Sequence, residues 1–225
     1  ISVGTQTLVG RRVGQGEPLE SGAVLANALL LAMVTSSVLT CVCIPLVPTY
    51  FKLTSAASEY VHIATGYTKW RFVGLVSMVV TAAYKAFYDG TGRTYVHFWA
   101  AVIMNVVNFA LCWVLIFGRY GFPHMGAEGA GLAAAISSWV GVLAMALFSL
   151  RKVDHDKYRP YRRGTINLAT IKQLAKLSVP SGLATMVVMT GFKAFIGIVH
   201  VFDNRLAEQT GGEPIYGAAT TIIIN

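Results

Sequence analysis

Charged residues are scarce in this sequence. Lysine, arginine, aspartate and glutamate together make up 12% of the 225 residues, and only 10 side chains are acidic. Soluble domains carry about a quarter charged residues, so the composition argues against an ordinary water-soluble globular protein. Hydrophobic residues account for 55% of the chain. The composition therefore predicts a membrane protein.

Residue patterns that support catalysis or metal binding are also missing. The sequence has no paired carboxylates, nucleophile elbow or phosphate-binding loop, and its five histidines lack ligand-like spacing. The "GAEGAG" at 126–131 lacks the preceding strand that a dinucleotide site needs. Cys41 and Cys43 lie in an apolar run, where they would face different directions on a helix. We therefore expect no enzyme, catalytic residue, metal site, cofactor or disulfide.

Long apolar runs dominate the chain. Three of them contain no charged residue: 22–47, 94–118 and 129–150. At about 1.5 Å per residue, a helix of this length crosses a hydrocarbon core about 30 Å thick. The runs 72–92 and 177–202 are almost as apolar but contain Lys85 and Lys193. The predicted fold class is therefore all-α, a polytopic transmembrane helical bundle.

Both ends of the chain are apolar as well. The sequence begins at Ile1 within an apolar stretch and stops at Asn225 inside "YGAATTIIIN". We expect part of a larger protein, with half a helix at each end. A cleaved signal peptide does not explain the start, because the apolar character continues beyond it.

The basic residues predict the orientation of the spans. If the loops alternate sides, loops 10–21, 89–93 and 151–176 share one side and carry eleven lysines and arginines. The opposite side carries five, in the loops 48–71, 118–128 and 203–213. Because cytoplasmic loops are enriched in lysine and arginine, the first side is predicted to be cytoplasmic.

The most basic stretch, "RKVDHDKYRPYRRG", interleaves tyrosines with arginines. A nucleic-acid site would have this composition, but a loop beside anionic lipid headgroups explains it without a further partner, so none is expected. Apolar residues then recur at near-helical spacing over 166–177, with lysines between them. This pattern predicts an amphipathic helix at the interface that leads into the next span.

Small residues recur every four positions in "GAEGAGLAAAISSWVG". They form two rows: Gly126, Ala130, Ala134 and Ser138, and Gly129, Ala133, Ser137 and Gly141. Small rows let helix backbones approach closely in lipid. The span is therefore predicted to lie centrally in the bundle.

Several motifs resemble the multidrug and toxic compound extrusion (MATE) transporters. "TQTLVGRRVGQGEP" (5–18) is similar to the end of that family's second helix and the following turn. Residues 105–138, which begin "NVVNFALCWVL", are similar to its fifth helix, external loop and sixth helix. "DGTGRT" (89–94) and "LSVPSGL" (177–183) resemble the end of the fourth helix and the start of the seventh.

The resemblance implies twelve transmembrane helices in two lobes, of which residues 1–150 would belong to the N-terminal lobe. Residues 151–176 would be the cytoplasmic linker with its amphipathic helix, and 177–225 the start of the C-terminal lobe. It also implies a multi-pass protein of the cell membrane, the inner membrane if bacterial. Its partners would be the remaining half of the transporter, the lipid bilayer and small-molecule substrates. Such a protein exports small organic, often cationic compounds by antiport coupled to Na⁺ or H⁺.

The sequence departs from this family at the positions that bind the coupling ion. Family members often have an asparagine in helix five, followed four residues later by Asp or Asn. Asn108 matches the first position, but Cys112 occupies the second. Where some members have a glutamate in helix seven, this chain has Val188, counting from Pro180. All acidic residues lie in predicted loops or at span ends, so the coupling ion stays open.

Asn105 and Asn108 lie three residues apart, on one face of a charge-free run. Asn108 would either line the cavity and offer oxygen to a cation or make an interhelical hydrogen bond, and for Asn105 the hydrogen bond is favoured. Lys193 lies midway along a span, where a charge is costly. It would pair with an acidic residue in the absent half of the transporter, repel a cationic substrate as a switch, or face the bundle and be satisfied by carbonyls or a water-filled cavity without a role in transport. Gln6 is a further substrate-cavity candidate, for which helix packing is the favoured interpretation. Tyr67, Trp70, Trp113 and Phe192 would offer aromatic surface to flat cationic drugs, although aromatic residues near membrane interfaces are more often anchors.

Two alternatives remain beside ion-coupled efflux. A lipid-linked polysaccharide flippase of the same broad fold would have more basic residues in its cavity, and Lys193 points weakly that way. A membrane scaffold that transports nothing would use its polar residues only to join helices.

Overall fold

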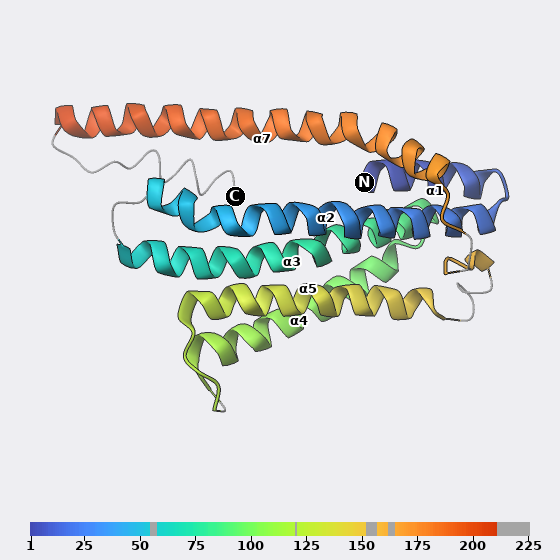
Figure 1. The fold of residues 1–225 in the computed structure, drawn as a ribbon, viewed down its shortest axis with the longest axis horizontal. Helices are drawn as coiled ribbons and strands as arrows, with labels where there is room; N and C mark the ends of the chain where they lie inside the picture. The colour runs from blue at the N-terminus through green and yellow to red at the C-terminus, as the bar shows by residue number, and fades with distance from the viewer. Residues whose placement is uncertain (55–57, 120, 152–156, 162–164, 211–225) are drawn as a thin grey trace. The chain divides into compact units, whose positions relative to one another are not determined.

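The structure, a computed structural model, describes residues 1–54, 58–119, 121–151, 157–161 and 165–210. Its helices are α1 (Ser2–Gly14), α2 (Pro18–Thr54), α3 (Ser58–Gly90), α4 (Thr94–Phe117), α5 (Gly126–Ser149) and α7 (Leu168–Thr210) (Figure 1). These described residues contain no strand. Five of the helices, all except α1, are long and apolar enough to cross a membrane. The predicted all-α polytopic transmembrane bundle is therefore confirmed.

Short turns join α1 to α2 and α3 to α4. Residues 15–17 join α1 to α2, a shorter turn than the predicted loop 10–21, because residues 10–14 continue α1 and Pro18 starts α2. Residues 91–93 join α3 to α4 within the predicted turn 89–93. Gly16 and Gly92 have φ angles of 76° and 74°, a left-handed conformation that glycine adopts without steric cost. The Arg12 guanidinium also pairs with the Glu17 carboxylate across the first turn, at 2.8 Å.

The loop predicted over 48–71 is wrong in its described part. The helix α2 continues to Thr54, and α3 already begins at Ser58. Pro45 and Pro48 lie at the predicted end of the apolar run, yet both are inside α2. A proline removes one backbone donor, but membrane helices tolerate this because neighbouring groups satisfy the freed carbonyl.

The helix α7 is also longer than the sequence pattern indicates. The amphipathic helix predicted over 166–177 begins at Leu168 and continues without a break into the following apolar run. At the other end α7 reaches Thr210, so the described part of the loop predicted over 203–213 is helical. Its Leu, Ala, Glu and Gln residues favour helix. The predicted start of an eighth helix lies outside the described residues.

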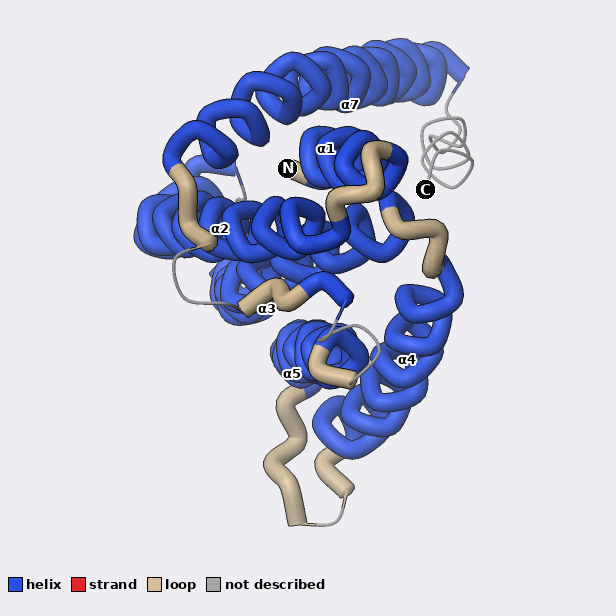
Figure 2. Tube along the Cα trace, turned by 90° about the vertical axis from the view of Figure 1, so that its right-hand side faces the viewer, coloured by secondary structure: helices blue, strands red, loops and turns tan. Residues whose placement is uncertain are grey.

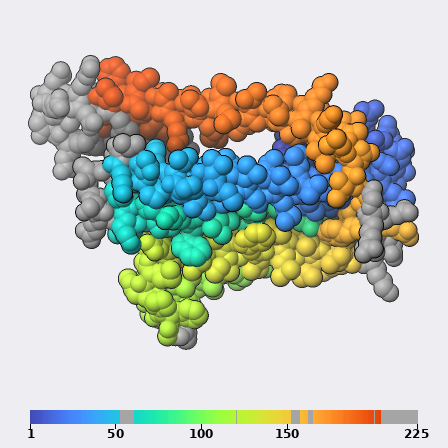
Figure 3. Space-filling view, viewed as in Figure 1, coloured from blue at the N-terminus to red at the C-terminus, as the bar shows by residue number. Residues whose placement is uncertain are grey.

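The chain forms two units, residues 1–178 and 179–225. In the first unit, α3 lies between α2 and α5, and α4 lies beside α5 (Figures 1 and 2). The side chains of α2, α3 and α5 fill the space between these helices (Figure 3). The described part of the second unit is the remainder of α7, whose large apolar side chains are exposed within that unit.

The small residues of α5 explain its close packing against α3 and α4, although α3 rather than α5 has the central position in the described first unit. A Cβ atom on Gly129 would lie 2.9 Å from the Leu115 carbonyl of α4, so this contact requires glycine. On the neighbouring face, a Cβ atom on Gly131 would lie 2.9 Å from the Tyr67 carbonyl of α3. The predicted row Gly129, Ala133, Ser137 and Gly141 is buried, which confirms that α5 packs closely against its neighbours.

The linker after α5 packs onto the end of the first unit where the α1–α2 and α3–α4 turns lie. We call this end of the unit the basic end, because the last turn of α1, the α3–α4 turn and the linker carry basic residues: Arg11, Arg12, Arg93, Arg151, Lys157 and Arg159. Tyr158 is 2% exposed, and its ring packs edge-on against Phe87 of α3 at 5.3 Å between centroids. The Tyr161 hydroxyl contacts both the Tyr84 hydroxyl, at 2.7 Å, and Ser149 Oγ, at 2.6 Å.

Asn27 of α2 completes this attachment. Its Nδ2 donates to the Thr165 carbonyl at 2.9 Å, and its Oδ1 accepts from the Asn167 backbone N–H at 2.8 Å. The Asn167 side chain in turn accepts from the Ala169 N–H at 2.9 Å, which caps the start of α7. The beginning of α7 is therefore fixed to α2 through a fully buried amide.

Candidate functional site

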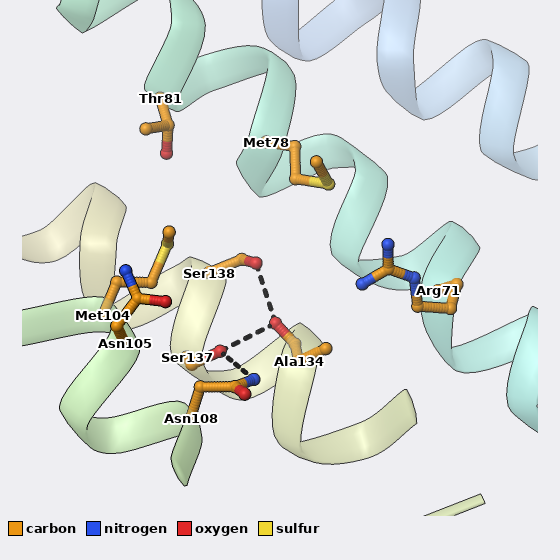
Figure 4. A pocket seen from close by; sticks show the side chains of 9 residues that line it. All are labelled: Arg71, Met78, Thr81, Met104, Asn105, Asn108, Ala134, Ser137 and Ser138. Carbon is orange, nitrogen blue, oxygen red and sulfur yellow. Dashed lines mark hydrogen bonds between the residues drawn. The ribbon is translucent and has the colours of Figure 1, made fainter. Parts of the chain in front are cut away.

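A cavity of about 310 Å³ opens between α3, α4 and α5 in the first unit. Each of the three helices contributes side chains to it (Figure 4). The lining residues are Arg71, Met78, Thr81, Met104, Asn105, Asn108, Ala134, Ser137 and Ser138. Because the helices around it are apolar, this group of polar side chains is the strongest candidate for a binding site.

A chain of hydrogen bonds forms one wall of the cavity. Asn108 Nδ2 donates to Ser137 Oγ at 3.0 Å, and Ser137 Oγ donates to the Ala134 carbonyl at 3.0 Å. Ser138 Oγ donates to the same carbonyl at 2.7 Å (Figure 4). The Cys112 thiol contacts Asn108 Oδ1 at 3.7 Å. Asn108 thus lines the cavity and also joins α4 to α5.

Asn105 and Thr81 line the cavity, and each has a polar atom without a hydrogen-bond partner among the described residues. Asn105 Nδ2 donates to the Ala101 carbonyl of its own helix at 2.9 Å, so its oxygen has no bond among the described residues. The Thr81 hydroxyl is buried and has no hydrogen-bond partner there either. Buried polar atoms of this kind are normally satisfied by water or a ligand. The Thr81 hydroxyl therefore offers bonding capacity to a molecule in the cavity, and the oxygen of the exposed Asn105 side chain does so as well.

Arg71 supplies the only charge among these lining residues, and sequence analysis missed it by placing it in a loop. A signal was present, because Arg71, Met78 and Thr81 are spaced by seven and three residues and so share one helix face. No carboxylate lines the cavity, so its chemistry is that of amides, hydroxyls, thioethers and one guanidinium.

The other candidates of the first unit lie outside this cavity. Cys112 contacts it only through Asn108, and Gln6 is exposed on α1. Tyr67 and Trp70 pack where α3 meets Gly131 of α5.

Trp113 is 46% exposed on α4. The Arg119 guanidinium lies over its ring, 4.9 Å from the centroid. This cation–π contact involves the chain's own arginine, and Trp113 is not among the residues that line the cavity.

Lys193, Phe192 and Val188 belong to the second unit. All three are exposed on α7 within that unit, so they are not part of the cavity between α3, α4 and α5. Among the described residues no group of three His, Cys, Asp or Glu side chains is placed to hold a metal ion.

Comparison with known proteins identifies the family. Residues 1–114, half of the chain, match the MatE family. The probable multidrug resistance protein NorM of Listeria innocua is 24% identical over 199 residues, which are 88% of this chain and 44% of that protein. The probable multidrug resistance protein YoeA of Bacillus subtilis is 26% identical over 216 residues, 94% of this chain and 46% of that protein.

Solved structures show the same fold. The inward-facing conformation of a multidrug resistance MATE family transporter of the MOP superfamily matches 97% of this chain, with a TM-score of 0.71 and 22% identity. A MOP superfamily transporter from Pyrococcus furiosus, described as having a binding pocket of reverse polarity, also matches 97%, with a TM-score of 0.73 and 21% identity. These matches cover 47% and 50% of the two solved chains. The chain spans about half the length of its relatives and belongs to the MatE family.

Proposed function

We propose that this chain is part of a secondary active transporter that exports small organic compounds by ion-coupled antiport. Membership of the MatE family and five helices that can cross a membrane support this proposal. The single observation that carries it is the polar cavity between α3, α4 and α5. A polar cavity inside an apolar bundle gives an exported molecule a place to bind within the membrane.

The groups around the cavity indicate how such a molecule would be held. The Asn105 oxygen and the Thr81 hydroxyl would bond its polar atoms, while Met78 and Met104 would contact its apolar parts. Methionine side chains adapt to ligands of different shape. Binding that differs between inward- and outward-open states would then bias the exchange between those states.

Ion coupling belongs to this proposal too, with H⁺ or Na⁺ as the ion. No carboxylate lines the described cavity, so we assign to Asn108 a supporting role beside an acidic group elsewhere in the full transporter. Its amide oxygen would contribute to the ion site, while its bond to Ser137 joins α4 to α5.

We also propose that the basic end faces the cytoplasm of a multi-pass protein in the cell membrane. The excess of lysine and arginine there supports this orientation. In a full-length transporter without its own cysteines, a Lys157→Cys thiol should react with an impermeant maleimide only after the cells are permeabilised. An Arg119→Cys thiol should react in intact cells, and the opposite pattern would reject the orientation.

Arg71 favours a second candidate function, the transport of anionic compounds such as lipid-linked saccharides. It is the only charged residue that lines the described cavity, and a guanidinium binds phosphate or carboxylate groups well. The positive charge of Arg71 in this cavity would be a counterpart to the reverse polarity described for the binding pocket of the Pyrococcus furiosus transporter.

Ethidium accumulation in cells that express the full-length transporter separates these proposals. Efflux of the cation should lower accumulation. Collapsing the gradient of the coupling ion, which is either the proton or the sodium gradient, should abolish the effect. Normal accumulation under every gradient would reject cation efflux and leave the anionic candidate or a scaffold. Uptake of a labelled anionic lipid-linked saccharide into vesicles would then decide between these two.

A further inference from the structure

A second cavity, of about 410 Å³, lies at the basic end between α1 and the first turns of α7. These two segments lie side by side (Figures 1 and 2). The cavity is lined by Leu8, Arg11, Arg12, Gln173, Lys176 and Leu177, all of which belong to the first unit. We call it the α1–α7 groove. It is separate from the cavity between α3, α4 and α5, with which it shares no lining residue.

The position of the groove is fixed by two contacts. Next to it, α1 and α7 touch at Gly4, where a Cβ atom would lie 2.5 Å from Ser178 Oγ and 2.9 Å from the Leu174 carbonyl. The start of α7 is held by Asn27 through the backbone of Thr165 and Asn167. Because both attachments are tight, the groove between them is a defined feature of the first unit.

The groove concentrates positive charge that the described residues neutralise only at Arg12. Arg12 pairs with Glu17 at 2.8 Å. Arg11 and Lys176 have no carboxylate within 4.0 Å among the described residues, and residues 157–202 contain no Asp or Glu at all. Two unpaired cations on facing helices repel each other unless an anion lies between them.

The walls of the groove combine these cations with apolar surface. Leu8 is 8% exposed and Leu177 40% exposed, so one leucine is buried and the other presents an apolar surface. The Gln173 amide adds a neutral donor. A small inorganic anion would use the cations and the amide but not the leucines, whereas a phospholipid uses both through its phosphate and the first carbons of its acyl chains.

We propose that the α1–α7 groove binds the headgroup of an anionic phospholipid from the leaflet at the basic end. The phosphate would lie between the Arg11 guanidinium and the Lys176 ammonium, with Arg12 and Gln173 beside it. Basic pockets between membrane helices on the cytoplasmic side recognise anionic lipids in this way. The inference rests on the proposed orientation of the basic end and not on transport activity.

Native mass spectrometry of the full-length transporter tests the proposal directly. The probes are phosphatidylglycerol, phosphatidylcholine and inorganic phosphate, each titrated separately, and the variants are Arg11→Gln/Lys176→Gln and the control Lys172→Gln. Lys172 is exposed one turn before Lys176 and does not line the groove, so its loss changes the charge of the same helix. No transport is measured, so failure of the proposed export would leave this result unaffected.

The wild type should bind phosphatidylglycerol more tightly than phosphatidylcholine. Each lost cation should weaken phosphatidylglycerol binding about fivefold, so the double variant should lose about 25-fold and Lys172→Gln less than twofold. If the double variant does not fold, Gln173→Glu, which adds a negative charge to the groove, should also weaken binding about fivefold. An equal loss in Lys172→Gln, unchanged binding in the groove variants, or inorganic phosphate binding as tightly as the lipid would each overturn the proposal.

Discussion

Asn108 of α4 donates a hydrogen bond to Ser137 of α5 at 3.0 Å, at the wall of the cavity between α3, α4 and α5. The sequence leaves two interpretations of Asn108 open, a residue that lines the cavity and a residue that makes an interhelical hydrogen bond, and the structure shows both. The amide joins two helices and also faces the cavity that we propose for transport. The two roles can be separated because the bond has a partner on each helix.

Replacing Asn108 tests the transport role. Asn108→Ala should abolish ion-driven export, because it removes the amide oxygen from the cavity. It should lower the stability by about 1 kcal/mol or less, the usual contribution of an interhelical bond in a membrane. Export from vesicles and the melting temperature of the purified protein measure the two effects.

Ser137→Ala is the matched control, since it removes the same interhelical bond and leaves the Asn108 amide in place. It should lower the melting temperature similarly and retain export. Equal loss of export in the two variants would mean that Asn108 serves only to join the helices, and unaltered export in Asn108→Ala would reject its role.

Arg71 should limit the binding of cations in this cavity. Arg71→Gln is expected to tighten binding of a cationic compound such as ethidium about fivefold, which corresponds to the roughly 1 kcal/mol between two unit charges about 4 Å apart in water. Equilibrium dialysis with the full-length transporter measures this affinity. Lys69→Gln removes a charge from an exposed position on the same helix that does not line the cavity, and it should change the affinity less than twofold. If both variants behave alike, Arg71 acts only through the general surface charge.

The contact between α5 and α3 at Gly131 should tolerate no side chain. A Cβ atom there would lie 2.9 Å from the Tyr67 carbonyl, which is backbone and cannot rotate away. Gly131→Ala is therefore expected to destabilise the protein by about 1–3 kcal/mol, as overpacking does. The control Gly182→Ala lies on α7, where no atom is within 4 Å of the added Cβ atom. Thermal unfolding should show a lower melting temperature for the first variant only, and equal melting temperatures would contradict the close packing.

Asn27 should hold the linker against the first unit. Asn27→Ala removes the bonds to Thr165 and Asn167 and leaves two backbone groups without these partners, so a loss of about 2 kcal/mol is expected. Proteolysis by trypsin after Lys157 should become faster, because the linker detaches more often. Asn105→Ala, which removes only a bond within α4, should leave the cleavage rate unchanged. A linker that is equally resistant in both variants would argue against this attachment.

Much of the fold follows from the sequence because the bilayer imposes simple requirements. A helix in hydrocarbon must be apolar over its whole length, so the charge-free runs mark α2, α4 and α5 correctly. The row from Gly129 to Gly141 likewise predicts the close packing of α5.

The sequence-based predictions are wrong or incomplete where contacts between residues far apart in the sequence determine the structure. Pro48 is a local stop signal, yet α2 continues past it. The bonds of Asn27 join residues 138 and 140 positions apart, and no local pattern predicts them. Arg71 falls in the loop predicted over 48–71, yet it lies in α3. The cavity that brings Arg71 near Asn108 depends on the packing of three helices.

Protection of one cavity residue by substrate tests the central claim most directly. In a full-length transporter without native cysteines, a hydrophilic maleimide should label Ser138→Cys, which lines the cavity. Trp139→Cys, the adjacent position on the outer face of α5, is the control. The account predicts that ethidium slows labelling at position 138 several-fold and has no effect at position 139. Labelling at position 138 that ethidium does not change would contradict the assignment of this cavity to the transported molecule.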